Sequence, residues 1–556
     1  MPILNWIGKE AVVNHDKDVP FRLLKKVKSL SYGENSQNLI IHGDNLEALK
    51  ALMPYYQGQV KCIYIDPPYN TGNEGWVYND KVNSPKIKKW LGKVVGSESE
   101  DLCRHDKWLC MMYPRLKLLR DLLSDDGVIF VSIDDNELVS LRSIMDDLFN
   151  EQNRVDRGIL IWNNAGSTRG FRRIVKNHEY ILAYGKNQEL VESVYAKNFP
   201  TISDTIDERL QIKRTNRNPL AKVTFPKGLK IEGVSDIIFR DSVGRGTNRI
   251  DIINGTMEFK NGKLVKDVLL EASFPYKNQM IEFFSKLGTS EKTYDYKGQE
   301  WLEVYFRKNG VPYFRKKRGT VVLGSVINNC ANSGSPDLEK LGMKNVFSNP
   351  KPVELIKRLL AFFTDKNALI LDSFAGSGTT GQAVLDLNKE DGGNRKFILI
   401  EIGEKLKEPI KLDDGTILAN TEQITTERVK RAINKYDYKT GFEYCELDKP
   451  LFNEDGQIEQ ECTFEQLATY IYFTETNTNI DKKEISGNFI GDYDETEYYL
   501  IFKEKGKNIL SKGFLEKLKK DNKKKVIYAD KCLIDERTLE KYKIQFKQIP
   551  YEVKVY

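Results

Sequence analysis

Residues 368–381 read ALILDSFAGSGTTG, an apolar run that leads directly into a glycine-rich turn. Residues 382–387 continue with the spacing of a helix that opens there. Gly376, Gly378 and Gly381 have the G-x-G-x-x-G spacing, in which glycines allow a tight turn and a close approach of the backbone to a cofactor at a helix N-terminus. This strand, turn and helix predict a nucleoside-binding α/β sheet.

An acidic residue follows the glycines at a suitable distance. The apolar run 397–400 ends in Glu401, where such folds place a side chain that binds ribose hydroxyls. The same fingerprint suits NAD, so a nicotinamide-dependent oxidoreductase is an alternative. However, the turn comes late in the chain, Asp372 precedes the glycines, and Thr379 and Thr380 follow them. This arrangement favours a zwitterionic amino-acid tail over a pyrophosphate.

A second apolar run, 62–65, ends in Asp66, Pro67, Pro68 and Tyr69. The amine of a nucleobase is a poor nucleophile because its lone pair is delocalised into the ring. The Asp66 carboxylate and the Pro67 carbonyl could accept its two N–H groups in a preorganised site, and proline fixes φ and adds no competing N–H. Tyr69 would offer a face to a base taken out of the duplex. The motif predicts amino-group methylation, although alone it also fits an ordinary turn.

Together, and in this order, the two motifs resemble those of the β-class S-adenosylmethionine-dependent DNA amino-methyltransferases. The closer resemblance is to the modification (Mod) subunit of type III restriction-modification systems, carried also by residues 39–49, 65–72, 131–137 and 349–352. It implies methylation of adenine N6 on a base flipped out of double-stranded DNA, with cytosine N4 as an alternative target. It further implies a homodimer and a possible restriction (helicase/endonuclease) subunit as partner.

The resemblance also implies roles for individual residues. Asp44 would hydrogen-bond the cofactor adenine, although it also stands where a helix cap is expected. Lys351 and Pro352 would border the methionine moiety, and Pro352 also fits the first turn of a helix over 353–363. The other cofactor-binding positions are Asp372 or its neighbours at the methionine amino group, Phe374, Gly376, Gly378 and Thr379 in the glycine loop, and Glu401 at the ribose.

Composition limits the other classes of function. The seven cysteines form no C-x-x-C pair and the four histidines show no ligand spacing, so we expect no metal site. A net charge of +6 suits a polyanionic partner without identifying one. No apolar stretch approaches the length of a membrane span, the first residues lack a secretory pattern, and unpaired cysteines fit a cytoplasmic location.

The βα rhythm divides the chain into four predicted regions. Residues 1–154 form an N-terminal arm and the catalytic half of the methyltransferase domain, with strands at 39–42, 62–65 and 128–133 and helices at 45–53, 107–123 and 136–149. Residues 155–335 form a mixed, β-rich target-recognition domain, 336–438 the cofactor-binding half, and 439–556 a small α/β domain for assembly or simple stabilisation. The two halves are expected to close into one doubly wound, mostly parallel seven-stranded methyltransferase sheet that is circularly permuted around the insert.

Several polar segments are candidates for DNA contact. The loop between residues 72 and 106 interleaves Trp76, Tyr78 and Trp90 with lysines, which suits a nucleic-acid strand or equally a surface insertion. Within the recognition region, arginine and asparagine are enriched at 163–170, 213–217, 244–249 and 315–318. Because such a region could also serve a subunit that binds DNA without modifying it, a non-catalytic recognition subunit is a further alternative.

Overall fold

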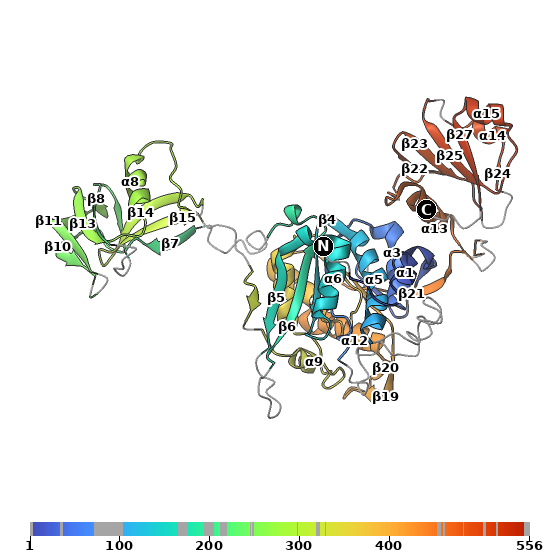
Figure 1. Ribbon diagram of the computed structural model, residues 1–556, viewed down its shortest axis with the longest axis horizontal. Helices are drawn as coiled ribbons and strands as arrows, with labels where there is room; N and C mark the ends of the chain where they lie inside the picture. The colour runs from blue at the N-terminus through green and yellow to red at the C-terminus, as the bar shows by residue number, and fades with distance from the viewer. Residues whose placement is uncertain are drawn as a thin grey trace. The chain divides into compact units, whose positions relative to one another are not determined.

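The computed structural model describes residues 4–33, 37–71, 104–164, 176–193, 205–211, 219–244, 246, 249–296, 298–317, 323–328, 330–452, 458–459, 462–481, 483–503, 508–518 and 521–549. The chain forms two compact units (Figure 1), one from residues 1–198 and 323–556, the other from residues 199–322. The predicted aromatic loop at 72–103 and the basic segment 213–217 lie outside the described residues.

A ten-stranded sheet forms the centre of the first unit, in the order β1-β21-β2-β18-β17-β3-β4-β6-β5-β16. In that order its strands are Arg22–Lys26, Glu443–Pro450, Leu39–His42, Lys396–Glu401, Leu369–Asp372, Val60–Ile65, Leu123–Ile133, His178–Gly185, Arg154–Asn163 and Val326–Ile327. The six strands from β21 to β4 are parallel, and β6 joins them antiparallel. The predicted doubly wound sheet is confirmed, but it is wider than seven strands because β1 extends one edge and β5 and β16 the other.

Helices cover both faces of this sheet (Figure 1). On one face α3 (Asn45–Tyr56), α5 (Arg104–Leu122) and α6 (Leu138–Phe149) pack against each other and share an apolar core with β3 and β4. The other face carries α10 (Val353–Phe363), α11 (Thr379–Asp391) and α12 (Thr421–Tyr436). Strands covered on both faces must be apolar throughout, which explains sequences such as VKCIYI in β3.

The chain reverses its winding direction between β17 and β3. These two strands are parallel neighbours, with Ile370 opposite Cys62. From β17 the chain passes through α11 to β18 on one side, and from β3 it passes through α5 to β4 on the other. In open α/β sheets a crevice lies outside the carboxyl ends of the strands at such a switch point. Asp66 and the glycine loop both begin there.

Two predicted boundaries differ from the structure. Strands β5 and β6 fall within the region 155–335 but belong to the ten-stranded sheet, where β6 pairs with β4. Strand β21 falls within 439–556 and pairs with β1 and β2 in the same sheet. Short β-like runs without helices between them do not indicate which sheet they will join, because strand pairing is non-local.

The second unit is β-rich, as predicted. Its sheet has the order β7-β15-β14-β9-β12-β11-β13-β8, with β10 paired to β11. In chain order β7 to β15 are Thr205–Arg209, Leu220–Phe225, Lys230–Glu232, Ile237–Val243, Ile250–Lys260, Lys263–Leu264, Val268–Ser273, Trp301–Arg307 and Pro312–Lys317, and helix α8 is Lys277–Ser285. The unit has its own core, which includes Phe225, Phe259 and Phe306.

The C-terminal segment forms a four-stranded sheet in the order β22-β23-β25-β27 (Phe489–Tyr493, Thr496–Leu500, Lys524–Ala529, Ile544–Gln548). It also holds the β24–β26 pair (Ile509–Leu510, Lys531–Cys532) and helices α13 (Phe464–Thr476), α14 (Lys512–Leu515) and α15 (Glu536–Lys541). The smaller elements elsewhere are α1 (Lys9–Val12), α2 (His15–Asp18), α9 (Ser335–Lys340) and the β19–β20 pair (Lys405–Lys411, Ile417–Asn420). Among the helices in the described parts of the chain, none combines the length and apolarity needed to cross a membrane.

Candidate active site

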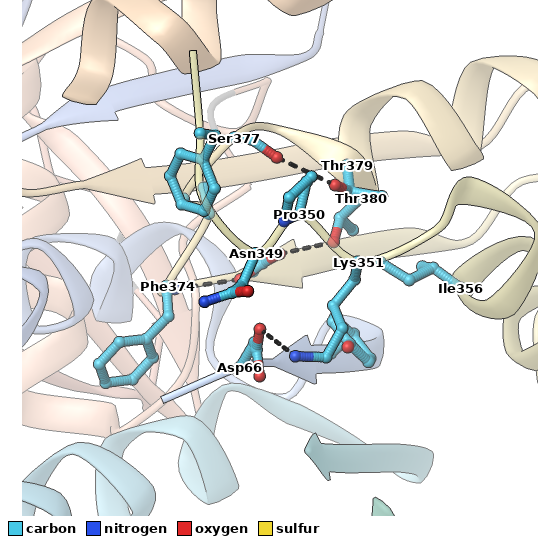
Figure 2. Close-up of a pocket in the computed structure, with 14 residues that line it drawn as sticks. Asp66, Asn349, Pro350, Lys351, Ile356, Phe374, Ser377, Thr379 and Thr380 are labelled. Carbon is cyan, nitrogen blue, oxygen red and sulfur yellow. Dashed lines mark hydrogen bonds and ion pairs between the residues drawn. The ribbon is translucent and has the colours of Figure 1, made fainter. Parts of the chain in front are cut away.

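A pocket with about 310 Å³ of space, part of it open to solvent, lies at the switch point of the sheet (Figure 2). Its lining residues are Tyr64, Asp66, Phe347, Asn349, Pro350, Lys351, Ile356, Asp372, Phe374, Ala375, Gly376, Ser377, Thr379 and Thr380. The turn that begins at Asp66 and the glycine turn therefore face one cavity. Residues some three hundred positions apart meet because their strands are neighbours.

The Asp66 carboxylate is clamped on one side only. Its Oδ2 accepts a hydrogen bond of 2.7 Å from Lys351 Nζ, and Figure 2 shows the two groups facing each other. Its Oδ1 is buried and has no hydrogen-bond partner among the described residues. Burial raises the pKa of Asp66, while the Lys351 ammonium opposes that shift. The site thus holds an oriented carboxylate with one oxygen left for another donor.

Lys351 is shared between two carboxylates. Its Nζ lies 3.5 Å from Glu179 Oε2 on β6 and 4.9 Å from the centre of the Tyr69 ring. The Tyr69 hydroxyl donates to the same Glu179 oxygen at 2.9 Å. Burial lowers the pKa of Lys351, but Asp66 and Glu179 outweigh it and the pKa is raised overall. Lys351 is therefore a buried cation that links Asp66, Glu179 and Tyr69.

The proline turn is held from behind. Trp108 Nε1 donates a hydrogen bond of 2.7 Å to the Pro68 carbonyl. Pro67, which follows Asp66, is buried. Asn70 has a φ of 57° and donates to Glu137 Oε1 through Nδ2. Glu137 also bonds His105 Nδ1 at 2.6 Å. These contacts fix the backbone that carries the predicted catalytic motif.

The glycine loop approaches the pocket with its backbone. Gly376 and Gly378 have φ values of 53° and 80°, a conformation that favours glycine. The Gly376 N–H donates to Glu401 Oε2 at 2.8 Å, and Thr421 Oγ1 donates to Glu401 Oε1 at 2.6 Å. Glu401 thus ties the loop to α12, and burial raises the pKa of this carboxyl group to about 7.

Asp372 is the acidic group of the loop. Its carboxylate accepts from Thr380 Oγ1 at 2.5 Å and from the Phe374 N–H at 3.0 Å. Burial raises the pKa of Asp372 to about 7, and the two hydrogen bonds lower it only in part. Because a cation beside Asp372 would stabilise the ionised form, the residue suits an ammonium group at this end of the pocket.

The structure separates the predicted site residues into two groups. Those that line the pocket are Asp66, Lys351, Asp372, Phe374, Gly376 and Thr379. Those that stand behind or beside it are Asp44, Pro67, Pro68, Tyr69, Pro352, Gly378 and Glu401. Asp44 caps α3 by accepting from the Leu46 N–H and pairs with Arg115, and Pro352 occupies the N-cap position of α10. Their roles toward a cofactor stay predictions.

Several residues of the site were not predicted as site residues. Glu179 is the most important, because it contacts both Lys351 and Tyr69. The others that line the pocket are Tyr64, Phe347, Asn349, Pro350, Ile356, Ala375, Ser377 and Thr380. Asn349 and Pro350 precede Lys351 in the segment that carried the resemblance, so the sequence offered a reason to include them in the site. Among the described residues no group of three or more His, Cys, Asp or Glu side chains could hold a metal ion.

Two residues of the predicted DNA-contact segment 315–318 form ion pairs within the second unit. Arg315 pairs with Asp207, Glu232 and Glu303 at 2.8–3.1 Å and lies over the Tyr305 ring. Lys316 is buried and pairs with Glu208 and Asp295. Both charges are paired with carboxylates of the same unit, and the role of these residues toward DNA stays a prediction.

A family profile described as a DNA methylase (N6/N4 type) matches residues 60–412. The chain belongs to the N6/N4 DNA methylase family, whose members use S-adenosylmethionine, and is therefore a DNA methyltransferase. Within this family it is similar to the EcoP15I Mod subunit of Escherichia coli, a type III restriction-modification enzyme, with 31% identity over 80% of this chain and 71% of that protein. It is also similar to the EcoPI Mod subunit of Escherichia phage P1, with 32% identity over 78% of this chain and 68% of the relative. The nicotinamide alternative is set aside by this membership.

Proposed function

We propose that this chain transfers a methyl group from S-adenosylmethionine to N6 of an adenine flipped out of double-stranded DNA, as the modification subunit of a type III restriction-modification system. The observation that carries the proposal is the unpartnered Asp66 Oδ1 in the pocket that the glycine loop also lines. The similarity to two type III Mod subunits supports the restriction-modification setting.

The residues of the pocket fit the donor. Gly376 and Gly378 allow close backbone approach, and Asp372 is placed for an ammonium group. S-adenosylmethionine, when bound, supplies a methyl group activated by a sulfonium. The protein holds donor and acceptor together, and positioning of two reactants supplies much of the acceleration.

Asp66 and its neighbours act on the amine. Asp66 Oδ1 accepts one N–H of the target amine, while Lys351 holds Oδ2 and so fixes the orientation of the carboxylate. The Pro67 carbonyl accepts the other N–H. Two acceptors draw the nitrogen lone pair out of conjugation and stabilise the positive charge that develops as the methyl group arrives. The surplus proton leaves to solvent, and Tyr69 supports the flipped base.

Cytosine N4 is the second candidate target, because the acceptors contact only an exocyclic amine. The test is to express this chain alone and to sequence modified bases in the host DNA. The expected result is N6-methyladenine at one recognition sequence. If N4-methylcytosine is found instead, the target base is cytosine and not adenine. Asp66→Ala should abolish the modification and keep S-adenosylmethionine affinity within about threefold of wild type, since methylation depends on the preorganised acceptor. A protein that binds DNA but transfers no label would support the non-catalytic alternative.

The assembly around the enzyme is part of the proposal. The second unit reads the DNA sequence, the C-terminal domain supports a homodimer, and a restriction subunit docks on the dimer. Because the substrate is cellular DNA, the chain acts in the cytoplasm. Light scattering of the purified chain tests the dimer. A monomer at micromolar concentration would contradict the proposed homodimer and leave the proposed reaction unaffected.

A further inference from the structure

Arg428 is a fully buried arginine on α12 without a carboxylate partner in the described part of the chain. Its Nε donates to Gln382 Oε1 at 3.0 Å, and its Nη1 donates to Ser377 Oγ at 2.8 Å and to Thr379 Oγ1 at 2.6 Å. Its Nη2 is buried and has no hydrogen-bond partner among those residues. Burial lowers the pKa of Arg428 to about 10. Asp337 and Asp386 oppose that shift only in part. A buried cation in this state is stabilised further when an anion binds next to it.

The hydrogen bonds of Arg428 determine how the two hydroxyl groups can act. A guanidinium only donates, so the oxygens of Ser377 and Thr379 must both accept from it. The two hydroxyls lie 3.2 Å apart, and one can donate to the other. At least one hydroxyl proton is then left without an acceptor in the described structure. Both residues line the pocket, and Figure 2 shows them joined at the glycine loop.

The position of these hydroxyls at the start of a helix also favours a negatively charged ligand. Thr379 is the first residue of α11, a helix of 13 residues, and the N-terminus of a helix attracts anions. Asp372, which suits an ammonium group, bonds Thr380 in the same turn. The loop therefore offers an acidic group and a set of positively polarised donors side by side, as an amino acid zwitterion requires.

We propose that Arg428 makes the Ser377 and Thr379 end of the pocket the subsite for the α-carboxylate of S-adenosylmethionine. The inference rests on the proposed function for the identity of the cofactor. Arg428 is a positioning residue: it orients the two hydroxyls as donors and supplies the positive charge behind them. A residue that only joined α12 to the loop would stabilise the fold without distinguishing one ligand from another.

The test compares two ligands that differ only in the carboxylate. Isothermal titration measures binding of S-adenosylmethionine and of its decarboxylated form to the full-length chain. Variants are Arg428→Met, Arg428→Lys and Ser377→Ala, with Arg431→Met as control, because Arg431 lies on the same helix but pairs with Asp414 and Glu427. Wild type should prefer the carboxylated ligand by about tenfold or more, the value of one charge-assisted hydrogen bond. Arg428→Met should reduce that preference to below about threefold, with little change for the decarboxylated ligand.

The outcomes separate this inference from the proposed function. Equal weakening of both ligands in Arg428→Met would show a structural role and overturn the inference alone. Equal affinity of the wild-type protein for the two ligands would also overturn the inference, and this measurement does not depend on any variant. If Arg428→Met does not fold, Ser377→Ala must lower the preference on its own, and an unchanged preference overturns the inference. Failure of wild type to bind either ligand would overturn the cofactor assignment and this subsite together.

Discussion

Replacing Lys351 by methionine removes the only cation, among the described residues, that contacts Asp66. The two groups are 2.7 Å apart, and 10% of the Lys351 side chain is exposed. At an effective dielectric constant of about 20, their direct attraction is about 6 kcal/mol before desolvation. Truncating one member of a buried charge pair typically costs about 2–5 kcal/mol. The Lys351→Met protein can avoid part of this cost by taking up a proton on Asp66.

The sign of the pH effect follows from that proton. Burial and Glu179 both raise the pKa of Asp66, and Lys351 opposes them. Without the ammonium the pKa rises further, so less carboxylate is present at neutral pH to accept the amine. We expect methyl transfer at pH 7 to fall by about 10²-fold, the usual cost of one lost preorganised contact, and to recover as the pH is raised.

The assay is single-turnover transfer of tritiated methyl groups to DNA from pH 6 to pH 9 at saturating S-adenosylmethionine. The control is Lys351→Arg, which keeps the charge and should lose less than about tenfold. A loss in Lys351→Met that is the same at every pH would refute the reasoning. It would mean that Lys351 acts through shape or cofactor contact and not through the ionisation of Asp66.

Three further predictions test other parts of the molecule. Glu179→Gln should lower kcat by about tenfold, because it weakens the contacts of this side chain with Lys351 and Tyr69. The KM for S-adenosylmethionine should stay unchanged, and steady-state kinetics that show only a change in KM would contradict this prediction. With a pKa of about 7, Asp372 becomes ionised between pH 6 and pH 8, so cofactor affinity should rise by up to about tenfold over that range. Titration calorimetry measures this, and Asp372→Asn should flatten the profile. Arg315→Ala should reduce the free energy of unfolding by about 1–2 kcal/mol in denaturant titrations and leave the salt dependence of DNA binding unchanged, whereas a slope reduced by about one would mark Arg315 as a phosphate contact.

The meeting of Asp66 with the glycine loop could be predicted from sequence for a simple physical reason. Both segments follow apolar runs that read as buried parallel strands, and the carboxyl ends of parallel strands share one edge of a sheet. The structure has these runs as β3 and β17, paired in register. The helix 353–363 was likewise predictable from its periodicity and its proline cap. Local pattern and topology rules agree at these positions.

Glu179 and Arg428 could not be assigned in the same way. Glu179 lies on β6, which pairs antiparallel with both β4 and β5, and its place in the site depends on that long-range register. Arg428 left a weaker trace: it follows Ile424 by four residues and precedes Ala432 by four, on the buried face of α12. A charged residue at a core position of an amphipathic helix needs an explanation, but its partners on the glycine loop are set by packing alone.

The way the second unit is inserted explains why the sheet tolerates it. The chain leaves the first unit after residue 198 and rejoins it at 323. It returns through β16, whose Val326 and Ile327 pair with Ile161 and Trp162 of β5, and Ile161 N–H also bonds the Ser325 carbonyl at 2.8 Å. Trp162 is in turn opposite Glu179 on β6. The returning strand is therefore registered against β5, and β5 pairs in turn with β6, the strand that carries Glu179 to Lys351. Strand pairing within the first unit thus fixes the point at which the chain returns from the insert.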